Sequence, residues 1–467
     1  MTDKPAGAAA GVRCRPNIAV FVTDDQSQLD LAPYGAVGMR TPNMQRVADA
    51  GMKFAQAYVV SPTCAPSRAA MLTGLMPARN GAEANHGHAK PDIKKWPEYF
   101  QELGYEVVSF GKVAHYRQSA EYCFDYYAHD TFHDDGALPA ALEYLRNRPS
   151  DAEKPICFMF GSNWPHVPWP ENTDGIDEAE LELPAGSIDT EKTRRLRAQY
   201  VAGVEKADED LGAIYEAVCE TLGENTIFVF SADNGAQWPF AKWNCYEAGL
   251  RVPLIVKWPG QVEAGSSTDA IVSWLDLLPT LLEAVGGEAP AGIDGQSFLP
   301  VLRGETSLHR DRVHATHTGD GNWNVYPIRS LRLGDWKYIM NIHPEFAFTT
   351  HFDLPGNLTQ HDVWLTWLEK AETDPEAAAI VRRYHDRVED ELYDLAVDPY
   401  EQNNLAGEPE QAERLQRMKD ELLIWCREQN DQYTLSGEPR LLSDASSYGP
   451  EAVGGDARRL QLADTSD

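Results

Sequence analysis

Short runs of β-branched and aromatic residues recur along the first half of the chain, and polar or ionisable residues follow them. The clearest run, Asn17–Thr23, is typical of a parallel strand buried on both faces. Residues 42–52 and 188–219 instead predict helices. Alternating strands and helices indicate an α/β fold with a doubly wound, mostly parallel central sheet. Further strands are expected at residues 54–60, 106–110, 155–160, 226–230 and 252–257.

The pattern changes after about residue 310, where short strands are expected at Ile328–Arg332 and Trp336–Met340. An amphipathic helix is expected near residues 408–428. These features predict a smaller C-terminal α+β subdomain that contains a short antiparallel sheet. The predicted division is a large α/β domain over 1–310, the subdomain over 311–435 and an extended acidic tail over 436–467.

The charge balance is strongly acidic, with 41 Lys and Arg against 72 Asp and Glu and a formal net charge of −31. Nucleic acids and anionic membranes bind basic surfaces, so we expect neither as a partner. A long polyanion is not expected as a partner either, because the acidic chain would repel it. A small anionic substrate is compatible with this charge, because a local cationic pocket is enough to bind it.

Cysteine usage and the N-terminal sequence bear on the compartment. The seven cysteines include no C-x-x-C pair, so neither a zinc site nor a disulfide framework is predicted. Residues 6–12 form only a weak run of small residues, and no apolar stretch of 18 residues occurs. We therefore expect a cytoplasmic protein, or a periplasmic or secreted one if a leader has been removed.

Two pairs of oxygen-bearing side chains follow two of the predicted strands directly. Asp24 and Asp25 follow the first strand, and Asp233 and Asn234 follow the strand at 226–230. Ligands of doubly wound sheets gather beyond the carboxyl ends of the strands, so these side chains are expected at one edge. Each pair alone commonly marks a turn. Their joint placement favours a site for a hard cation, Ca²⁺ or Mg²⁺, and leaves the choice between these ions open.

Basic and imidazole side chains follow the other strands. Lysines and histidines are most often structural or solvated, but four of them stand at the same expected edge, where they would hold an anionic group. These four are Lys112, His115, His166 and Lys242. Further candidates, for which an ordinary loop is an equal alternative, are His86, His88, His317, Asn322 and Asn324.

The stretch Ser61–Gly74 is typical of a loop that turns into a helix. Pro66 suits the first helical position and Gly74 can end the helix, which places Cys64 just before the N-terminus. Free N–H groups there favour negative charge, so the Cys64 thiol is expected to have a lowered pKa and to be reactive. Arg68, about one turn on, can fold back toward the same spot. The alternative is a buried structural cysteine that caps the helix.

The string Cys-x-Pro-Ser-Arg at Cys64–Arg68 resembles the signature of the type I sulfatases, which belong to the alkaline phosphatase-like superfamily. The resemblance extends from Asn17 to about residue 430. It includes the N-terminal Asp-Asp, the Gly-Lys…His segment, Pro-His-x-Pro, Asp-Asn-Gly…Lys and Arg-Val-Pro-Leu-Ile-Val. It implies that family's version of the α/β fold and a sulfuric ester hydrolase activity.

The resemblance further implies that a formylglycine-generating enzyme oxidises Cys64 to formylglycine, which is hydrated to a gem-diol. One hydroxyl, bound to the metal, attacks sulfur in line with the leaving oxygen or nitrogen, and loss of the proton of the other hydroxyl then releases sulfate. The implied ligands of the Ca²⁺ or Mg²⁺ ion are Asp24, Asp25, Asp233, Asn234 and the modified Cys64.

The same resemblance suggests a role for each remaining candidate. Arg68 would bind the formylglycine, and Lys112 would bind the sulfate oxygens. His115 would take the proton of the second hydroxyl. His166 and Lys242 would serve the leaving group.

Within the family the chain is most similar to heparan N-sulfatase (sulfamidase), through segments at 233–239, 326–332 and 392–405. Two features depart from that pattern. Lys242 stands where sulfamidase has an arginine, and the Lys-x-x-His spacing of Lys112 and His115 resembles iduronate-2-sulfatase. Cleavage of S–N or of S–O therefore stays open. The expected substrate is a small sulfated saccharide or other sulfate monoester, cleaved at a chain end.

Two other functions are compatible with the sequence. A phosphonate or phosphate monoester hydrolase of the same superfamily would share the fold and can use formylglycine. A non-catalytic protein that binds sulfated glycans would keep the pocket and leave Cys64 unmodified.

Overall fold

The computed structural model describes residues 15–131, 134–149, 151–320, 324, 326–354 and 358–431. The predicted tail at 436–467 and the candidate Asn322 lie outside these residues. Two sheets organise the described part of the chain, one of nine strands and one of four. None of its helices is both long and apolar enough to cross a membrane.

The larger sheet is mixed but mostly parallel in its central part, as predicted. β1 pairs in parallel with β5 on one side and with β6 on the other, and β3 extends the parallel set beyond β5. Its strands, in spatial order, are β4 (Tyr126–Ala128), β3 (Glu106–Gly111), β5 (Ile156–Gly161), β1 (Asn17–Thr23), β6 (Thr226–Ala232), β8 (Leu254–Lys257), β2 (Met52–Tyr58) and β7 (Arg251–Val252), with β9 (Ser266–Ser273) paired to β2.

The expected strand at 252–257 is divided in the structure. β7 and β8 are separated by Pro253, which has no N–H to donate to a strand ladder. Both strands run antiparallel to their neighbours, and β8 pairs with β6 and β2. The sequence run located this segment but did not reveal its direction.

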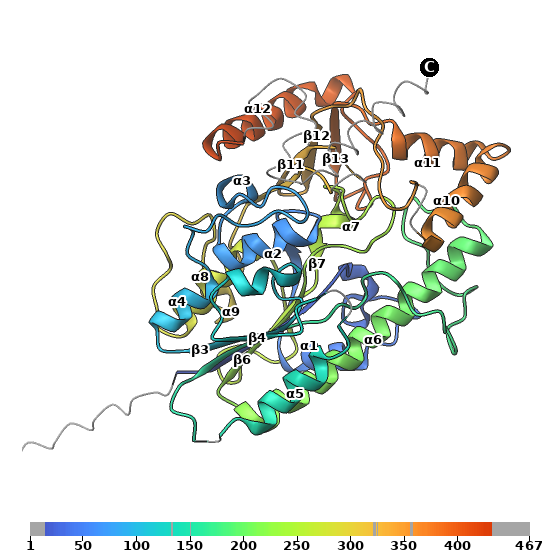
Figure 1. Ribbon diagram of the computed structural model, residues 1–467. Helices are drawn as coiled ribbons and strands as arrows, with labels where there is room; N and C mark the ends of the chain where they lie inside the picture. The colour runs from blue at the N-terminus through green and yellow to red at the C-terminus, as the bar shows by residue number, and fades with distance from the viewer. Residues whose placement is uncertain are drawn as a thin grey trace, which may run out of the picture.

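Helices cover both faces of the central sheet (Figure 1). Along β1, Ile18, Val20 and Val22 belong to one core, while Ala19 and Phe21 belong to the other. This alternation explains why residues 18–22 of the strand are all apolar. The first core packs against α2 (Cys64–Thr73), α4 (Trp96–Glu102), α8 (Leu277–Ala284) and α9 (Leu299–Leu302), and the second against α1 (Pro42–Ala50), α5 (Ala137–Asn147) and α6 (Glu191–Leu222).

The smaller sheet confirms the antiparallel C-terminal sheet expected from the sequence. Its order is β10 (Arg312–His317), β11 (Ile328–Leu333), β12 (Trp336–Asn341) and β13 (Asp390–Asp394). Helix α12 (Ala412–Glu428) covers one face with Met418 and Leu422 (Figure 1). The exact domain limits at 310 and 435 stay predictions.

The remaining helices are α3 (Pro77–Asn80), α7 (Glu247–Leu250), α10 (Leu358–Ala371) and α11 (Pro375–His385), with short 3₁₀ turns at Gln28–Asp30, Ala32–Tyr34, Tyr116–Glu121, Trp274–Asp276 and Pro409–Gln411.

Two glycines shape the edge where β3 and β5 end. Gly111 has a φ of 67°, and a Cβ there would lie 2.2 Å from the carbonyl oxygen of Gly161. A Cβ on Gly161 would in turn lie 2.1 Å from the carbonyl oxygen of Lys112. Only glycine allows this approach. The backbone can therefore turn sharply after β3 and carry Lys112 across the end of the sheet.

Candidate active site

Cys64 is the first residue of α2 and is buried beyond the carboxyl end of β1. Its Sγ lies 3.3 Å from Asp24 Oδ1 and 3.8 Å from Asp25 Oδ1. The helix begins two residues earlier than predicted, so Pro66 is its third residue. The proline is still tolerated, because the first four N–H groups of a helix have no partner within the helix.

The expected lowering of the Cys64 pKa is wrong. Burial of the thiol, together with the nearby Asp24 carboxylate, raises the pKa of Cys64 well above its usual value. The nearby charges of Lys112 and Lys242 oppose this rise in pKa but do not offset it. A neutral thiol is therefore the form that this surrounding favours, and the cysteine is not an activated thiolate nucleophile.

Four oxygen-bearing side chains surround the start of α2, at the ends of β1 and β6. One oxygen of each aspartate and the Cys64 sulfur all lie within 4.8 Å of one another. Asn234 Nδ2 donates to Asp25 Oδ1 at 2.7 Å, while Asn234 Oδ1 is buried and has no hydrogen-bond partner among the described residues. Burial, with Asp24 and Asp25 nearby, raises the pKa of Asp233.

This donor set fits a hard divalent cation. Crowded carboxylates and an amide oxygen without a partner are the features that oxygen ligands show before a cation joins them. Asp25 is also held at a φ of 61°, which is unusual for a residue other than glycine. The backbone N–H of Asp25 donates to Asp233 Oδ1 at 3.0 Å, so the two strand ends are tied together.

Three buried cations lie against these carboxylates. Arg68 Nε donates to Asp233 Oδ2 at 2.8 Å, Lys112 Nζ to Asp24 Oδ2 at 2.5 Å, and Lys242 Nζ to Asp25 Oδ2 at 2.7 Å. Burial alone would raise the pKa of Asp24, but Lys112 is the largest of the charges that hold it well below its usual value.

The three carboxylates and three cations balance each other in charge. A divalent cation added to this cluster would make it positive. The strand-end cluster, defined as these six side chains with Cys64 and Asn234, would then attract an anion in a chain whose net charge is −31.

The two predicted histidines make different contacts in this region. His166 Nδ1 donates to the carbonyl of Val167 at 2.7 Å, and its Nε2 lies 3.5 Å from Asp25 Oδ2. Burial lowers the pKa of His166 to about 3. His115 is buried, and its Nε2 lies 2.9 Å from His86 Nδ1.

The remaining candidate residues differ in the contacts that they make. His86 contacts His115, whereas His88 is exposed and pairs with Glu121 at 2.9 Å. His317 Nε2 lies 2.5 Å from Asn324 Oδ1, so these two bond to each other.

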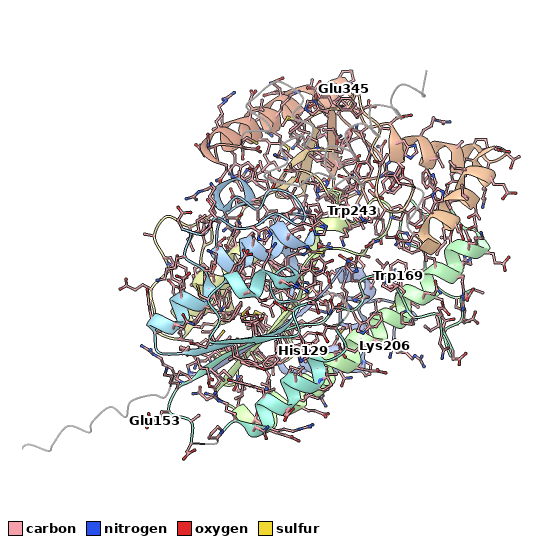
Figure 2. All side chains as sticks on the ribbon, viewed as in Figure 1. His129, Glu153, Trp169, Lys206, Trp243 and Glu345 are labelled. Atoms are coloured by element: carbon pink, nitrogen blue, oxygen red, sulfur yellow. The ribbon has the colours of Figure 1, made fainter. Side chains whose placement is uncertain are left out.

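Other residues, which the sequence pattern does not single out, connect this region to the site. Asp320, three residues after β10, lies 3.3 Å from His86 and accepts hydrogen bonds from Asn85 and Trp243. Asn85 Oδ1 also accepts from the backbone N–H of Ala65, next to Cys64. Trp243, labelled in Figure 2, donates its backbone N–H to the carbonyl of Pro62. Asp320 stands between the candidates His317 and Asn322 in the sequence, so the sequence pattern drew attention to this segment but not to Asp320 itself.

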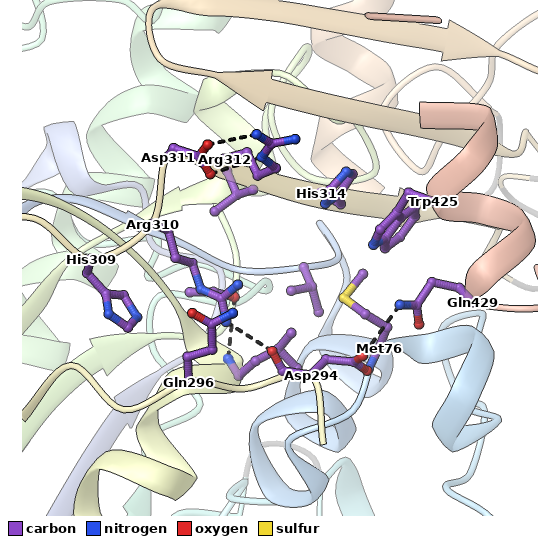
Figure 3. A pocket seen from close by; sticks show the side chains of 14 residues that line it. Met76, Asp294, Gln296, His309, Arg310, Asp311, Arg312, His314, Trp425 and Gln429 are labelled. Atoms are coloured by element: carbon purple, nitrogen blue, oxygen red, sulfur yellow. Dashed lines mark hydrogen bonds and ion pairs between the residues drawn. The ribbon is translucent and has the colours of Figure 1, made fainter. Parts of the chain in front are cut away.

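A cavity of about 460 Å³ lies elsewhere, between Met76, which precedes α3, strand β10 and the last turn of α12 (Figure 3). Its lining includes none of the candidate residues of the strand-end cluster. Figure 3 shows Trp425 beside His314, and their rings stack at 4.3 Å. The arginines in its wall are already paired, Arg310 with Asp276 and Arg312 with Asp311. Among the described residues that line this cavity, neither arginine is therefore free to bind a sulfate group.

Comparison with known proteins decides the family. The sulfatase family model matches residues 16–287, more than half of the chain. The chain belongs to the sulfatase family. The model of the C-terminal region of N-sulphoglucosamine sulphohydrolase also matches this sulfatase, over residues 235–354. The predicted family and the predicted enzyme class, a sulfatase hydrolase, are thereby confirmed.

Curated relatives and a solved structure agree with this assignment. The sulfatase is 29% identical to an ulvan-active sulfatase of Formosa agariphila, over 92% of this chain and 84% of the relative. It is 25% identical to human N-sulphoglucosamine sulphohydrolase, over 90% and 91%. A protein solved in complex with its substrate D-glucosamine-2-N,6-O-disulfate has the same fold, with a TM-score of 0.67 and 21% identity over 91% of this chain and 100% of that one.

Proposed function

We propose that this sulfatase hydrolyses a sulfate ester or sulfamate on a small sulfated carbohydrate, with Cys64 converted to formylglycine. The observation that carries the proposal is the position of Cys64. It lies at the start of α2, within 4 Å of two carboxylates at the end of β1 and in the same cluster as three buried cations. A neutral, buried thiol in such a place is a poor nucleophile, which supports chemical conversion before use.

Asp24, Asp25, Asp233 and Asn234 are proposed to hold the cation, for which we favour Ca²⁺ and keep Mg²⁺ open. The cation would supply positive charge to the sulfuryl oxygens and favour the ionised form of an attacking hydroxyl. The hydrated aldehyde at position 64 would supply the attacking hydroxyl and a second one, whose deprotonation releases sulfate. The formylglycine-generating enzyme remains the proposed maturation partner.

The other residues of the cluster are assigned roles from their positions. Lys112 and Arg68 are proposed to hold the sulfate oxygens and the modified residue 64, because both are buried and bonded to the cluster's carboxylates. Lys242 and His166, both against Asp25, are proposed to serve the leaving oxygen or nitrogen. His115 is proposed to accept the proton of the second hydroxyl.

The substrate class is inferred from charge and from the relatives. The strand-end cluster with a divalent cation suits one sulfate group, whereas the acidic chain as a whole would repel a long polyanion. The relatives carry names that refer to ulvan and to N-sulphoglucosamine. We infer a sulfated saccharide that is cleaved at a chain end, with S–O and S–N cleavage both retained.

A substrate panel tests this proposal on enzyme matured by co-expression with a formylglycine-generating enzyme. The panel contains 4-methylumbelliferyl sulfate, phosphate and phenylphosphonate, together with glucosamine 2-N-sulfate, glucosamine 6-O-sulfate and heparin. Faster turnover of a sulfated monosaccharide than of the phosphorus esters and of heparin is expected. Preference for a phosphonate would instead favour the phosphonate hydrolase, and preference for heparin would contradict cleavage of small substrates.

A further inference from the structure

A chain of three side chains, Asp320, His86 and His115, begins in the C-terminal part of the molecule and ends three residues after Lys112 of the strand-end cluster. Asp320 Oδ1 lies 3.3 Å from His86 Nε2, and His86 Nδ1 lies 2.9 Å from His115 Nε2. The rings of His86 and His115 meet edge to face, with centroids 4.8 Å apart. The three residues belong to three separate segments of the sequence, so the fold alone brings them together.

Asp320 is held as a carboxylate. Its second oxygen, Oδ2, accepts from Asn85 Nδ2 at 3.0 Å and from Trp243 Nε1 at 2.7 Å. Burial would raise the pKa of Asp320, but the hydrogen bond from His86 and the surrounding donors hold it well below the usual value. An ionised carboxylate can only accept hydrogen bonds. The contact with Asp320 therefore requires that His86 Nε2 carries a proton.

The state of His86 determines the state of His115. When His86 carries its one proton on Nε2, its Nδ1 is bare, and the proton that lies between the two rings then belongs to His115 Nε2. Neutral His115 then has a bare Nδ1. That nitrogen is buried and has no hydrogen-bond partner among the described residues. Burial and the nearby Lys112 lower the pKa of His115, which keeps the ring neutral.

We propose that Asp320 and His86 are positioning residues that fix the tautomer of His115, so that His115 Nδ1 is the nitrogen that accepts a proton during turnover. The proposal rests on the proposed function, in which His115 is the base. Neither Asp320 nor His86 needs to touch the substrate. Their part is to hold the ring and its proton in one arrangement, as a carboxylate behind a catalytic histidine does in hydrolases.

The backbone at His86 supports a dedicated position. Its φ is 67°, in the left-handed region that residues other than glycine adopt uncommonly. The flanking Asn85 fixes this turn, because its N–H donates to the carbonyl of Gly319 and its Oδ1 accepts from the N–H of Ala65. The turn is therefore anchored both beside Asp320 and beside Cys64.

Nitrogen-15 NMR of histidine-labelled protein reads the tautomer directly, without any need for turnover. The His115 signals are assigned from their loss in His115→Gln. The expected result is a protonated Nε2 and a bare Nδ1 in the wild type, and a mixture of tautomers in Asp320→Asn. A protonated Nδ1 in the wild type, or no change in Asp320→Asn, would overturn the proposal.

Kinetics of His86→Gly test the consequence for turnover. Glycine suits the positive φ, so the fold should tolerate this change. We expect kcat to fall about 10- to 100-fold with little change in KM, because a misdirected base still binds substrate. His86 is 55% exposed, so added imidazole can enter the vacated space and is expected to restore part of kcat.

His88→Gly is the matched control, because His88 is equally exposed but pairs with Glu121 outside the chain of contacts. Its kcat should equal that of the wild type. An unchanged kcat in His86→Gly, or a loss that imidazole does not rescue, would contradict the positioning role. Failure of the proposed function is distinguishable, since a matured wild-type enzyme would then turn over no sulfate ester while the NMR spectrum still reports the tautomer.

Discussion

Two buried clusters of charged side chains look alike in composition but differ in how their hydrogen bonds are satisfied. Around Asp276, every carboxylate lone pair is engaged by the guanidinium of Arg310, the ring of His309 and the backbone N–H groups of Ser273 and Gln296. Burial opposes ionisation there, but the Arg310 hydrogen bond leads the interactions that lower the pKa of Asp276.

The strand-end cluster is the opposite case. Burial and the neighbouring Asp24 and Asp25 raise the pKa of Asp233, although Arg68 bonds to it. Asn234 Oδ1 and one guanidinium nitrogen of Arg68 make no hydrogen bond among the described residues. A satisfied cluster stabilises a fold, whereas a crowded and incompletely bonded one is ready for a ligand. This difference in hydrogen bonding favours the strand-end cluster as the proposed active site more than burial or charge alone does.

The largest effect should follow removal of Cys64. Cys64→Ala is expected to lower kcat/KM more than about 10⁴-fold, because it removes the reacting group, while the melting temperature stays close to the wild type. Turnover of 4-methylumbelliferyl sulfate and thermal unfolding provide the two measurements. Cys245→Ala, a buried cysteine outside the cluster, is the control and should keep its turnover. Retained activity in Cys64→Ala would remove this residue from the mechanism.

Two matched amide substitutions, one in each cluster, test whether the Asp276 cluster stabilises the fold and the strand-end cluster binds a ligand. Asp276→Asn leaves the buried Arg310 without its charge partner and should lower the free energy of unfolding by about 3 kcal/mol. Asp233→Asn relieves the crowding of carboxylates, so it should cost less stability but abolish the rise in melting temperature that Ca²⁺ gives the wild type. Denaturant unfolding with EDTA and with added Ca²⁺ measures both. A Ca²⁺ response that survives in Asp233→Asn would contradict the metal assignment.

Lys242 separates a role in catalysis from a role in binding. Lys242→Ala is expected to lower kcat about 100-fold and to change KM less, because a group that serves the leaving atom acts mainly in the transition state. Steady-state kinetics on a sulfated monosaccharide measures the split. Lys242→Arg keeps the charge and should retain more of kcat. A rise in KM alone would make Lys242 a substrate-binding residue.

The smallest expected effect concerns Asp210, a half-buried acid whose side chain accepts a hydrogen bond from Ser162 Oγ at 2.7 Å. Burial raises the pKa of Asp210 to about 6, so the fold favours its protonated form. The stability that Asp210 contributes is therefore present below the pKa of the unfolded chain and is lost as the pH rises through about 6. Asp210→Asn should stabilise the protein by roughly 2 kcal/mol at pH 8, and the gain should shrink toward pH 4. Equal gains at both pH values would contradict this account.

The fold and most members of the strand-end cluster could be predicted because their signals are local. Each strand is a contiguous apolar run, and Asp24 and Asp233 follow β1 and β6 directly. The direction of β8 was not predictable in this way, since antiparallel and parallel partners leave the same apolar run.

The failures have a common physical cause, which is contact between distant segments. The Cys64 pKa depends on burial and on a carboxylate from another strand, neither of which the helix N-terminus reveals. Asp320 acquires its importance only when the fold places it against His86. In both cases the residue types were visible in the sequence and their neighbours were not.

The most direct test of the account is mass spectrometry of the tryptic peptide Phe54–Arg68 after co-expression with a formylglycine-generating enzyme. The account predicts that Cys64 carries an aldehyde, seen as the mass change from thiol to formylglycine and as capture by a hydrazide reagent. An intact thiol at Cys64, in cells where a control sulfatase is fully modified, would contradict it.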